Sequence, residues 1–368
     1  MLKVTKTALV VSALTLGSMS VANAAYLMKP SFGPVQTFTL EKDVNTIGML
    51  ANYGAIYNVA LDVDQSTVDA INSRTFAESK TNGIWLAPTY SKSSRSYSPA
   101  REKDFDVDVL LTGLNIGLEL GHEKGWACGA IFNFGKAETD GSGNASNVEN
   151  NADYFSFGAY GKMAFDNLKV TGDMVLSVVS NEFEGNTPSG KNVKQVKSDV
   201  DTNVFSMGVT GIYTFNTSFA DITPHLALRY TSIELDETPY YVNASNVISG
   251  YFARNSIKTV DIFSVPFGVT VSKSIQAGDW NLVPKFDVTF TSNFGDDEME
   301  YENVGYTRTG ATAVWTNKLE FLDNFTYGAT LGLDAKYKDC LDLGVGVGYT
   351  GSSNSDKFNV TANIGYRF

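Results

Sequence analysis

The C-terminal residues of the chain alternate strictly between apolar and polar side chains. From Phe358 to Phe368 every second residue is apolar, and the chain ends on an aromatic side chain. The apolar positions are Phe358, Val360, Ala362, Ile364, Tyr366 and Phe368. Because successive side chains of a strand point to opposite faces, one face of this segment is apolar and the other polar. Such a strand fits a closed β-barrel in lipid, where outward side chains contact acyl chains and inward ones line a wet lumen.

The N-terminus has the pattern of an export signal. Lys3 and Lys6 precede an apolar run over residues 7–21, and the Ala-Asn-Ala sequence at 22–24 supplies the small residues that signal peptidase recognises. The run is interrupted by serine, threonine and glycine, and about 20 mostly apolar residues are needed to span a membrane. We therefore expect residues 1–24 to be a signal peptide that is removed on export, rather than a retained anchor.

Composition agrees with a barrel and argues against one class of partner. The mean hydropathy is −0.10, and no later stretch approaches a membrane helix. Alternating strands hide their hydrophobicity in such averages, so the low value is no objection. The formal net charge is −12, and loss of the two signal-peptide lysines gives −14. An acidic chain is a poor nucleic-acid binder, so we expect no nucleic-acid partner.

From Asn82 onward the sequence divides into segments of barrel-strand length, joined by linkers that are short and long in strict turn. Bacterial barrels have an even number of antiparallel strands, short periplasmic turns and longer outer loops. The pattern predicts an all-β fold, a twelve-stranded antiparallel transmembrane β-barrel over residues 82–368. The predicted strands are 82–93, 105–121, 125–137, 151–165, 167–181, 199–214, 221–234, 255–274, 279–293, 323–338, 340–350 and 357–368. The predicted outer loops are 94–104, 138–150, 182–198, 235–254, 294–322 and 351–356.

The inward faces of these strands are polar and mixed in sign. We expect the opposite charges to pair across the lumen rather than to form a selective ring. The inward charged residues are Lys169, Asp173, His225, Arg229, Lys285, Asp287, Asp334 and Lys336. Trp126 and Trp280 follow short turns and, together with Tyr366 and Phe368, predict an aromatic girdle at the inner interface.

A helix is predicted ahead of the barrel, over Ile56–Glu78. This segment lacks the two-residue rhythm and contains neither glycine nor proline. It carries charged residues that include Asp69 and Arg74, and it has no wide apolar stripe to bury against an apolar core. Its expected neighbour is a polar wall. A 20-residue helix is about 30 Å long, which matches the membrane hydrocarbon core, so this helix can thread the lumen and plug it.

The order of these features resembles the translocator domain of an autotransporter, the barrel of type V secretion. The resemblance covers about residues 56–368 and is carried by short phrases at 83–85, 111–117, 154–160, 222–224 and 364–368. It implies a barrel that brings an upstream passenger to the cell surface and keeps the helix in its pore as a plug. It also implies that Arg74 pairs with a lumen carboxylate, such as Asp173, Asp287 or Asp334. Residues 25–55 are short for a passenger, so we expect a vestigial passenger or a linker there.

Several partners are expected for such a chain. Periplasmic chaperones would hold the unfolded protein, and the barrel-assembly machinery would recognise the last strand by its apolar face. The residues of this assembly signal are Phe358, Val360, Ile364, Tyr366 and Phe368. The product is expected to be a monomer in contact with lipid in the outer membrane of a Gram-negative bacterium.

The remaining motifs carry no chemistry. The G-x-G-x-x-G match at 346–351 is followed by a polar linker instead of the helix that a dinucleotide site needs. The two histidines, His122 and His225, lie near inner turns with no adjacent nucleophile arrangement, so we expect neither an enzyme nor a cofactor. Cys128 points to lipid and Cys340 lies at a turn several strands away. A disulfide needs Cα atoms within about 7 Å, so two free thiols are expected.

Three alternatives stay open. The acidic residues between Asp296 and Glu302 supply oxygen ligands for Ca²⁺, although their spacing matches no defined calcium loop. A porin-like channel for small solutes would have the same barrel with an open lumen. An adhesin would act through the outer loops 235–254 and 294–322.

Overall fold

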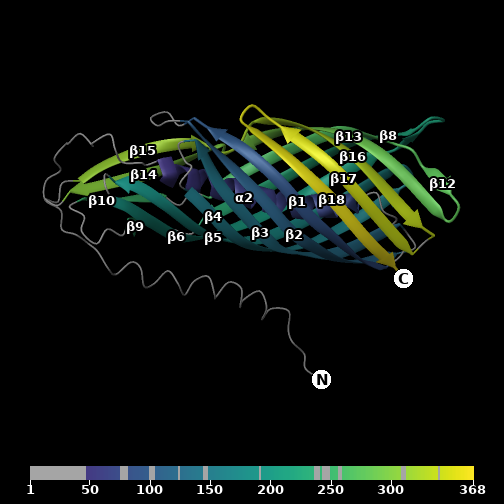
Figure 1. Cartoon of the computed structure of the whole chain (residues 1–368). Coiled ribbons are helices and arrows are strands. Elements are labelled where there is room, and N and C mark those ends of the chain that lie inside the picture. Colours follow the sequence, from purple (N-terminus) through teal and green to yellow (C-terminus); the bar gives the residue numbers. More distant parts are fainter. Residues whose placement is uncertain are drawn as a thin grey trace, which may run out of the picture.

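Twelve antiparallel strands form a closed ring in the part of the chain that the structure describes (Figure 1). The structure is a computed structural model, and it describes residues 47–74, 82–98, 104–122, 125–143, 148–189, 192–235, 241–242, 249–255, 259–307, 312–338 and 340–368. The barrel strands are β1 (Gly83–Tyr97), β2 (Phe105–His122), β3 (Trp126–Gly143), β4 (Val148–Phe165), β5 (Leu168–Ser189), β6 (Asn192–Tyr213), β8 (Asp221–Leu235), β11 (Val260–Ser272), β13 (Trp280–Gly295), β16 (Phe325–Tyr337), β17 (Leu341–Gly351) and β18 (Ser355–Arg367). This order confirms the predicted twelve-stranded barrel. Residues 1–24, predicted as a signal peptide, lie outside the described residues.

The first and last strands close the barrel. In the β1–β18 pair Gly83 lies opposite Arg367, and Arg95 lies opposite Ser355. The apolar face of β18 points outward, and its side chains, from Phe358 to Phe368, are well exposed. We call the end with the short turns the inner end and the end with the long connections the outer end.

The outer connections contain more strand than the sequence predicted. β5 and β6 continue as one hairpin to Ser189 and Asn192, through the predicted loop 182–198. A separate antiparallel sheet of β10 (Ser249–Asn255), β14 (Glu298–Thr307) and β15 (Thr312–Glu320) lies at the outer end (Figure 1). These strands fall in the predicted loops 235–254 and 294–322. The loop predictions were wrong because a polar segment can form a strand. It needs neighbouring strands for its backbone hydrogen bonds and water around its side chains. Three short strands, β7 (Phe215–Asn216), β9 (Tyr241–Val242) and β12 (Ile275–Ala277), extend neighbouring strands.

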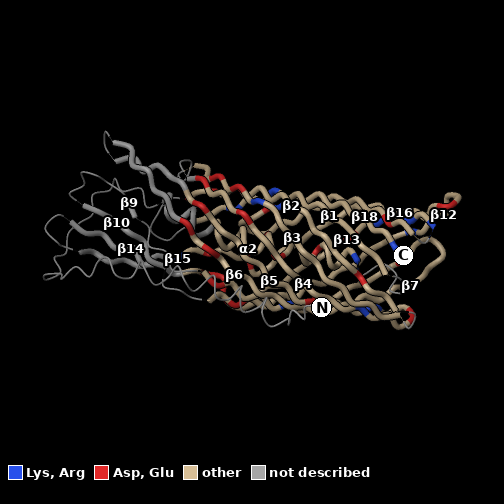
Figure 2. The backbone as a smooth tube through the Cα atoms, turned by 90° about the horizontal axis from the view of Figure 1, so that it is seen from below, with Lys and Arg blue, Asp and Glu red and all other residues tan. Residues whose placement is uncertain are grey.

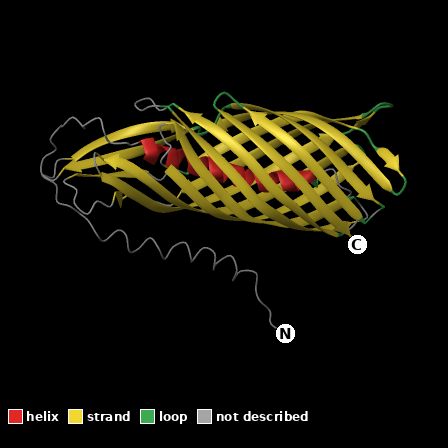
Figure 3. Cartoon of the chain, viewed as in Figure 1, coloured by secondary structure: helices red, strands yellow, loops and turns green. Residues whose placement is uncertain are grey.

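One helix, α2 (Ile47–Ser73), runs along the inside of the barrel from the outer end toward the inner end (Figure 3). It begins nine residues before the predicted start at Ile56. The added segment contains Gly48 and Gly54, but glycine costs a helix only about 1 kcal/mol, which tertiary packing overrides. The helix ends at Ser73 rather than at Glu78, and residues 75–81 lie outside the described part. No helix among the described residues is long and apolar enough to cross a membrane.

The hydrophobic pattern of the wall inverts along the strands. On the inner part of β2, Ile116 and Leu118 point outward and are exposed, whereas on its outer part Val107 and Val109 point inward and are buried. We call the outer part of the wall the upper tier and the rest the lower tier. The upper tier has inward apolar side chains at Phe105, Val107, Val109, Leu111, Ala137, Ala152, Val179, Phe183, Val200, Val204, Ile233, Leu235, Val260 and Ile262. The lumen was predicted to be polar throughout, and for the upper tier this was wrong.

Carboxylates occupy the outward positions of the upper tier. Exposed examples are Glu138, Asp140, Glu149, Asp153, Glu182, Asp199, Asp201, Glu234 and Asp261. Figure 2 shows this concentration of acidic residues toward the outer end, on the left of the picture, with a mostly tan stretch of barrel wall to its right. An apolar interior with a charged exterior is the arrangement of a protein in water, and an apolar exterior is that of a protein in lipid. The barrel therefore has a lipid-embedded lower tier and a water-exposed upper tier.

Candidate functional site: the occupied lumen

The helix is held in the lumen by side chains from several strands. Ser206 of β6 donates a hydrogen bond to Asp64 at 2.6 Å, and Asn133 of β3 donates to the hydroxyls of Ser66 and Thr67 at 2.9 Å. On the opposite side Asp62 accepts a hydrogen bond from Ser93 of β1. These partners stand on inward positions of their strands, so these four polar residues of α2 are satisfied by the polar lumen wall.

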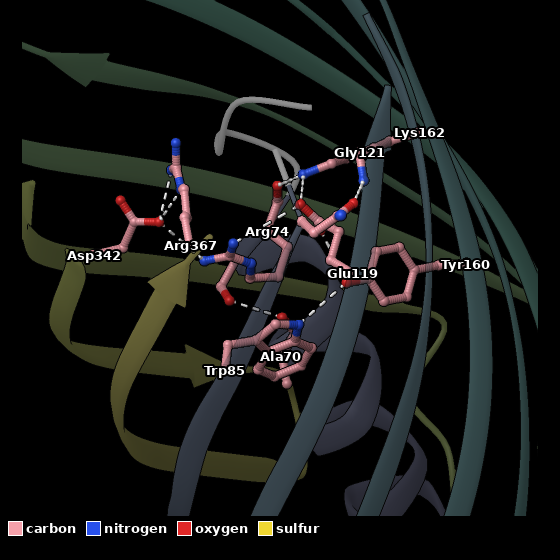
Figure 4. Close-up of polar contacts among 11 residues, drawn as sticks. Ala70, Arg74, Trp85, Glu119, Gly121, Tyr160, Lys162, Asp342 and Arg367 are labelled. Carbon is pink, nitrogen blue, oxygen red and sulfur yellow. Dashed lines mark hydrogen bonds and ion pairs between the residues drawn. The ribbon is translucent and has the colours of Figure 1, made fainter. Parts of the chain in front are cut away.

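The C-terminal end of α2 is fixed by a buried cluster of charges (Figure 4). We call it the inner lock, and its members are Arg74, Glu119, Lys162, Asp342 and Arg367. Lys162 Nζ lies 2.8 Å from Glu119 and donates a hydrogen bond of 3.0 Å to the backbone carbonyl of Arg74. The guanidinium of Arg74 lies between Glu119 at 3.9 Å and Asp342 at 3.8 Å. Cations near the last carbonyls also interact favourably with the helix dipole.

Two aromatic side chains support the inner lock. Trp85 Nε1 donates to the Tyr160 hydroxyl at 3.2 Å, and that hydroxyl donates to Glu119 at 2.9 Å. The Arg74 guanidinium lies 5.9 Å from the centre of the Trp85 ring, within cation–π range. The Trp85 ring lies so close to Gly117 that a Cβ there would be 2.0 Å from it. Glycine at position 117 therefore gives Trp85 the space to lie flat against the wall.

The predicted lumen charges pair between nearby strands along the wall, rather than across the lumen. Arg229 of β8 makes a bidentate contact with Asp173 of β5, at 2.8 and 2.7 Å. Lys285 of β13 binds Asp334 of β16 at 2.8 Å. His225 Nε2 lies 2.9 Å from Asp287, which also accepts hydrogen bonds from Thr270 and Thr289. Lys169 and Lys336 take inward positions on β5 and β16, and Asp69 of α2 accepts a hydrogen bond from Gln65.

Arg74 contacts lumen carboxylates, as predicted, but not the three that were named as examples. Asp173, Asp287 and Asp334 each have a partner on the wall, and Arg74 contacts Glu119 and Asp342 instead. The partners of Arg74 depend on how far the helix extends toward the inner end of the barrel. The helix ends at Ser73, so Arg74 reaches the inner rim, where Glu119 and Asp342 stand close to the ends of β2 and β17.

Sequence reasoning missed Glu119, Lys162 and Lys357 as lumen residues. A signal was present, because each of these three residues falls on the inward register of its strand. Lys357 is an example, since it alternates with Phe358 at the start of the last strand and binds Asp62 at 2.8 Å. The register does not specify the position along the barrel axis at which each side chain meets the helix.

The outer end of the lumen is filled by an apolar core. Ala55, Ile56, Tyr57, Val59, Ala60 and Val63 of α2 are buried against the upper tier, together with Met299, Leu319 and Phe321. The rings of Tyr57 and Phe321 stack with centroids 4.6 Å apart. The helix was predicted to lack a wide apolar stripe for burial, and for its outer half this prediction was wrong. We call this cluster the outer seal.

Next to the outer seal, Asp323 organises the outer turn between β17 and β18. Its carboxylate accepts hydrogen bonds from Ser352 and Ser353 at 2.7 Å and from Asn354 at 2.9 Å, and it forms an ion pair of 2.9 Å with Arg95 of β1. Burial acts to raise the pKa of Asp323, but these hydrogen bonds and the guanidinium outweigh burial and hold the pKa below its usual value. Residues 321–323 thus connect α2, β1 and the β17–β18 turn.

The two cysteines and the acidic run at residues 296–302 are the remaining features predicted from the sequence. Cys128 is exposed on the outward face of β3, Cys340 lies in the turn after β16, and both are free thiols. In the acidic run, Asp296 accepts a hydrogen bond from the Asp261 amide and Glu298 pairs with Lys318, which gives these carboxylates structural partners. The side chains of residues 300–302 lie outside the described residues. Among the described residues no group of three potential ligands is arranged to hold a metal ion.

One protein-family model matches most of the chain. Residues 84–347 match the model of the autotransporter beta-domain. A search of curated proteins finds no significant relative.

Solved translocator barrels have the same fold. The translocator domain of autotransporter NalP from Neisseria meningitidis superposes with a TM-score of 0.64 at 13% identity, covering 85% of this chain and 98% of that one. The transport unit of AIDA-I from Escherichia coli gives 0.57 at 14% identity, with 78% and 90% covered. The beta domain of the Bordetella autotransporter BrkA gives 0.55 at 17% identity, with 78% and 100% covered.

Proposed function

The chain belongs to the autotransporter β-domain family, and we propose that its barrel carries the segment ahead of α2 to the cell surface and anchors it there. Family membership and fold place the protein in the outer membrane of a Gram-negative bacterium. The observation that carries the proposal is the direction of α2. Tyr57 packs on Phe321 at the outer end and Arg74 binds Glu119 at the inner end, so the chain ahead of α2 joins it at the outer end.

Surface exposure on intact cells tests this proposal. A protease-cleavable epitope inserted after Ala25 should be removed by external protease. The matched control carries the same epitope at Gly278, in the short turn between β12 and β13, and should be protected until the outer membrane is opened. An epitope at Ala25 that stays protected in intact cells, while opened cells lose it, would contradict the proposal.

Assembly is proposed to follow the route expected for a barrel of this family. Export removes residues 1–24, periplasmic chaperones hold the chain, and the assembly machinery recognises the apolar face of β18 that ends in Phe368. The mature protein is proposed to act as a monomer, with neither nucleic acid nor a cofactor as a partner.

No enzymatic activity is proposed. Autotransporter translocator domains are transport barrels, not enzymes. The best acid–base pair in the lumen, His225 with Asp287, also supports this reading. The hydroxyls of Thr270 and Thr289 bind the Asp287 carboxylate, not the imidazole that would have to activate a nucleophile.

The porin and adhesin alternatives differ in their support. A passive porin needs an open lumen, whereas α2 and the outer seal occupy this one. The adhesin alternative rests on residues 235–254 and 294–322, and most of the side chains in these segments lie outside the described residues.

A further inference from the structure

The helix fills only one side of the lower lumen. It packs against β2 to β6, where the inward side chains of Asn133, Ser156 and Ser206 have no exposed surface. On the other side, the inward side chains of Lys285 and Asp334 keep 24% and 35% of their surface exposed. Thr361 is exposed although it stands on the inward face of β18. The lower lumen therefore has a tightly packed side and a loosely filled side.

A cavity of about 120 Å³, lined by charged and polar side chains as well as apolar ones, occupies the loosely filled side. It lies between α2 and the wall formed by β1, β13, β16, β17 and β18, and we call it the recess. Gly346 of β17 has no side chain to fill the cavity, and the lining carries hydroxyl, amide and charged groups of both signs. A cavity that is roomy and polar holds water, whereas an apolar one of this size stays dry.

Two buried polar atoms of the recess lining have no protein partner. They are Ser91 Oγ and Asn115 Oδ1, in side chains that are 2% and 0% exposed. A buried polar atom without a partner is unfavourable, so a water molecule is the expected partner of each atom.

The outer seal differs from the recess in its polarity and in its packing. Its side chains are apolar and almost fully buried, and they surround the outer half of α2. A close-packed apolar interior has few voids that a water molecule can enter, and an apolar constriction excludes ions by dewetting. Asp323 extends this closure over the β17–β18 turn through hydrogen-bonded contacts.

We propose that the recess is filled with water, and that the permeability barrier of the barrel is the outer seal, not the polar lower half of the helix. The barrier then lies in the upper tier, above the lipid-embedded wall. This inference depends on the barrel orientation and not on whether the segment ahead of α2 is displayed.

Cysteine accessibility locates the barrier. The background carries Cys128→Ala and Cys340→Ser, and the purified folded barrel is treated with a small charged thiol reagent. Thr361→Cys and Asn359→Cys in the recess should react fully. Val109→Cys and Val204→Cys, which are also inward but lie in the outer seal, should react at least about a hundredfold more slowly, since labelling there needs local opening. Equal rates at the two sets of positions would overturn the proposal.

Conductance in planar bilayers gives the second readout. Val109→Ser combined with Val204→Ser should raise the current through the barrel several-fold, because it hydrates the outer seal. Asn359→Ala and Thr361→Ala, which widen the recess, should leave the current at the wild-type level. Recess variants that conduct as well as seal variants would overturn the proposal, as would seal variants that stay closed while migrating as folded barrels on unheated gels.

Discussion

Lys357 of the closing strand forms an ion pair with Asp62 of the lumen helix, with 2.8 Å between Nζ and Oδ1. Ser93 of β1 binds the other oxygen of the same carboxylate at 2.7 Å. One helix residue thus contacts both strands of the β1–β18 seam, so docking of the helix and closure of the barrel stabilise each other.

Removal of one partner of this pair should loosen the helix. Lys357→Ala leaves Asp62 half-buried with only a hydroxyl partner, and we expect a loss of about 1–3 kcal/mol in the free energy of unfolding. Urea unfolding in lipid vesicles, followed by tryptophan fluorescence, measures the change. The control is Lys136→Ala, which breaks an exposed pair with Asp153 and should have no measurable effect. An equal loss in both variants would contradict the assigned role.

The inner lock should lose more stability than the Lys357–Asp62 pair when one of its charges is removed. Glu119→Gln keeps the shape but removes the carboxylate that pairs with Lys162 and leaves Arg74 with Asp342 alone, and breaking a buried pair in this way costs about 3–5 kcal/mol. The expected readout is faster protease cleavage near Arg74 in the folded barrel, compared with wild type. Combining Glu119→Gln with Lys162→Met removes the stranded cation and should restore part of the protection. No difference between the single and double variants would argue against a charge effect.

Acid should open the turn held by Asp323. The pKa of this carboxyl is depressed in the folded chain, so its contribution is fully present above the unfolded value of about 3.9 and is lost as the pH falls through the folded pKa. Hydrogen exchange at the Ser352 and Ser355 amides should therefore accelerate below about pH 4 beyond the intrinsic rate. In Asp323→Asn the same amides should exchange fast at neutral pH and show little further loss of protection in acid. Wild-type protection that stays constant from pH 7 to pH 2 would contradict this assignment.

The terminal aromatic should matter for assembly more than for stability. Phe368 is 66% exposed on the outward face, so Phe368→Ser removes little packing within the barrel. We expect less folded protein in the outer membrane of cells and near-normal refolding of the purified chain in detergent. Refolding that fails in detergent as severely as assembly fails in cells would assign Phe368 a structural role instead.

The sequence predicted the barrel well because alternation in a membrane strand is imposed by lipid on one side and water on the other. It predicted the outer end poorly, because the apolar residues there take the inward positions of the strands instead of the outward ones. In β2 the apolar residues shift from even positions such as Ile116 and Leu118 to odd positions such as Val107 and Val109. This inversion was visible in the sequence, and it marks where the barrel leaves the membrane.

The charge pairs of the lumen were less predictable. Register places Asp173, Arg229, Lys285 and Asp334 on the inward face, but pairing depends on the stagger between strands and on the depth of the helix. The position of Arg74 illustrates this, since its partners Glu119 and Asp342 are set by where α2 ends.

The central claim is that α2 lies inside the barrel at the described height. The most direct test is a short thiol crosslinker applied to Asp64→Cys with Ser206→Cys in the cysteine-free background, in isolated outer membranes. Because Asp64 and Ser206 are in hydrogen-bond contact at 2.6 Å, this pair should crosslink, and Asp64→Cys with the outward Val209→Cys should not. Failure of the Ser206 pair to crosslink in folded barrels, or crosslinking of the Val209 pair, would contradict a helix held in the lumen.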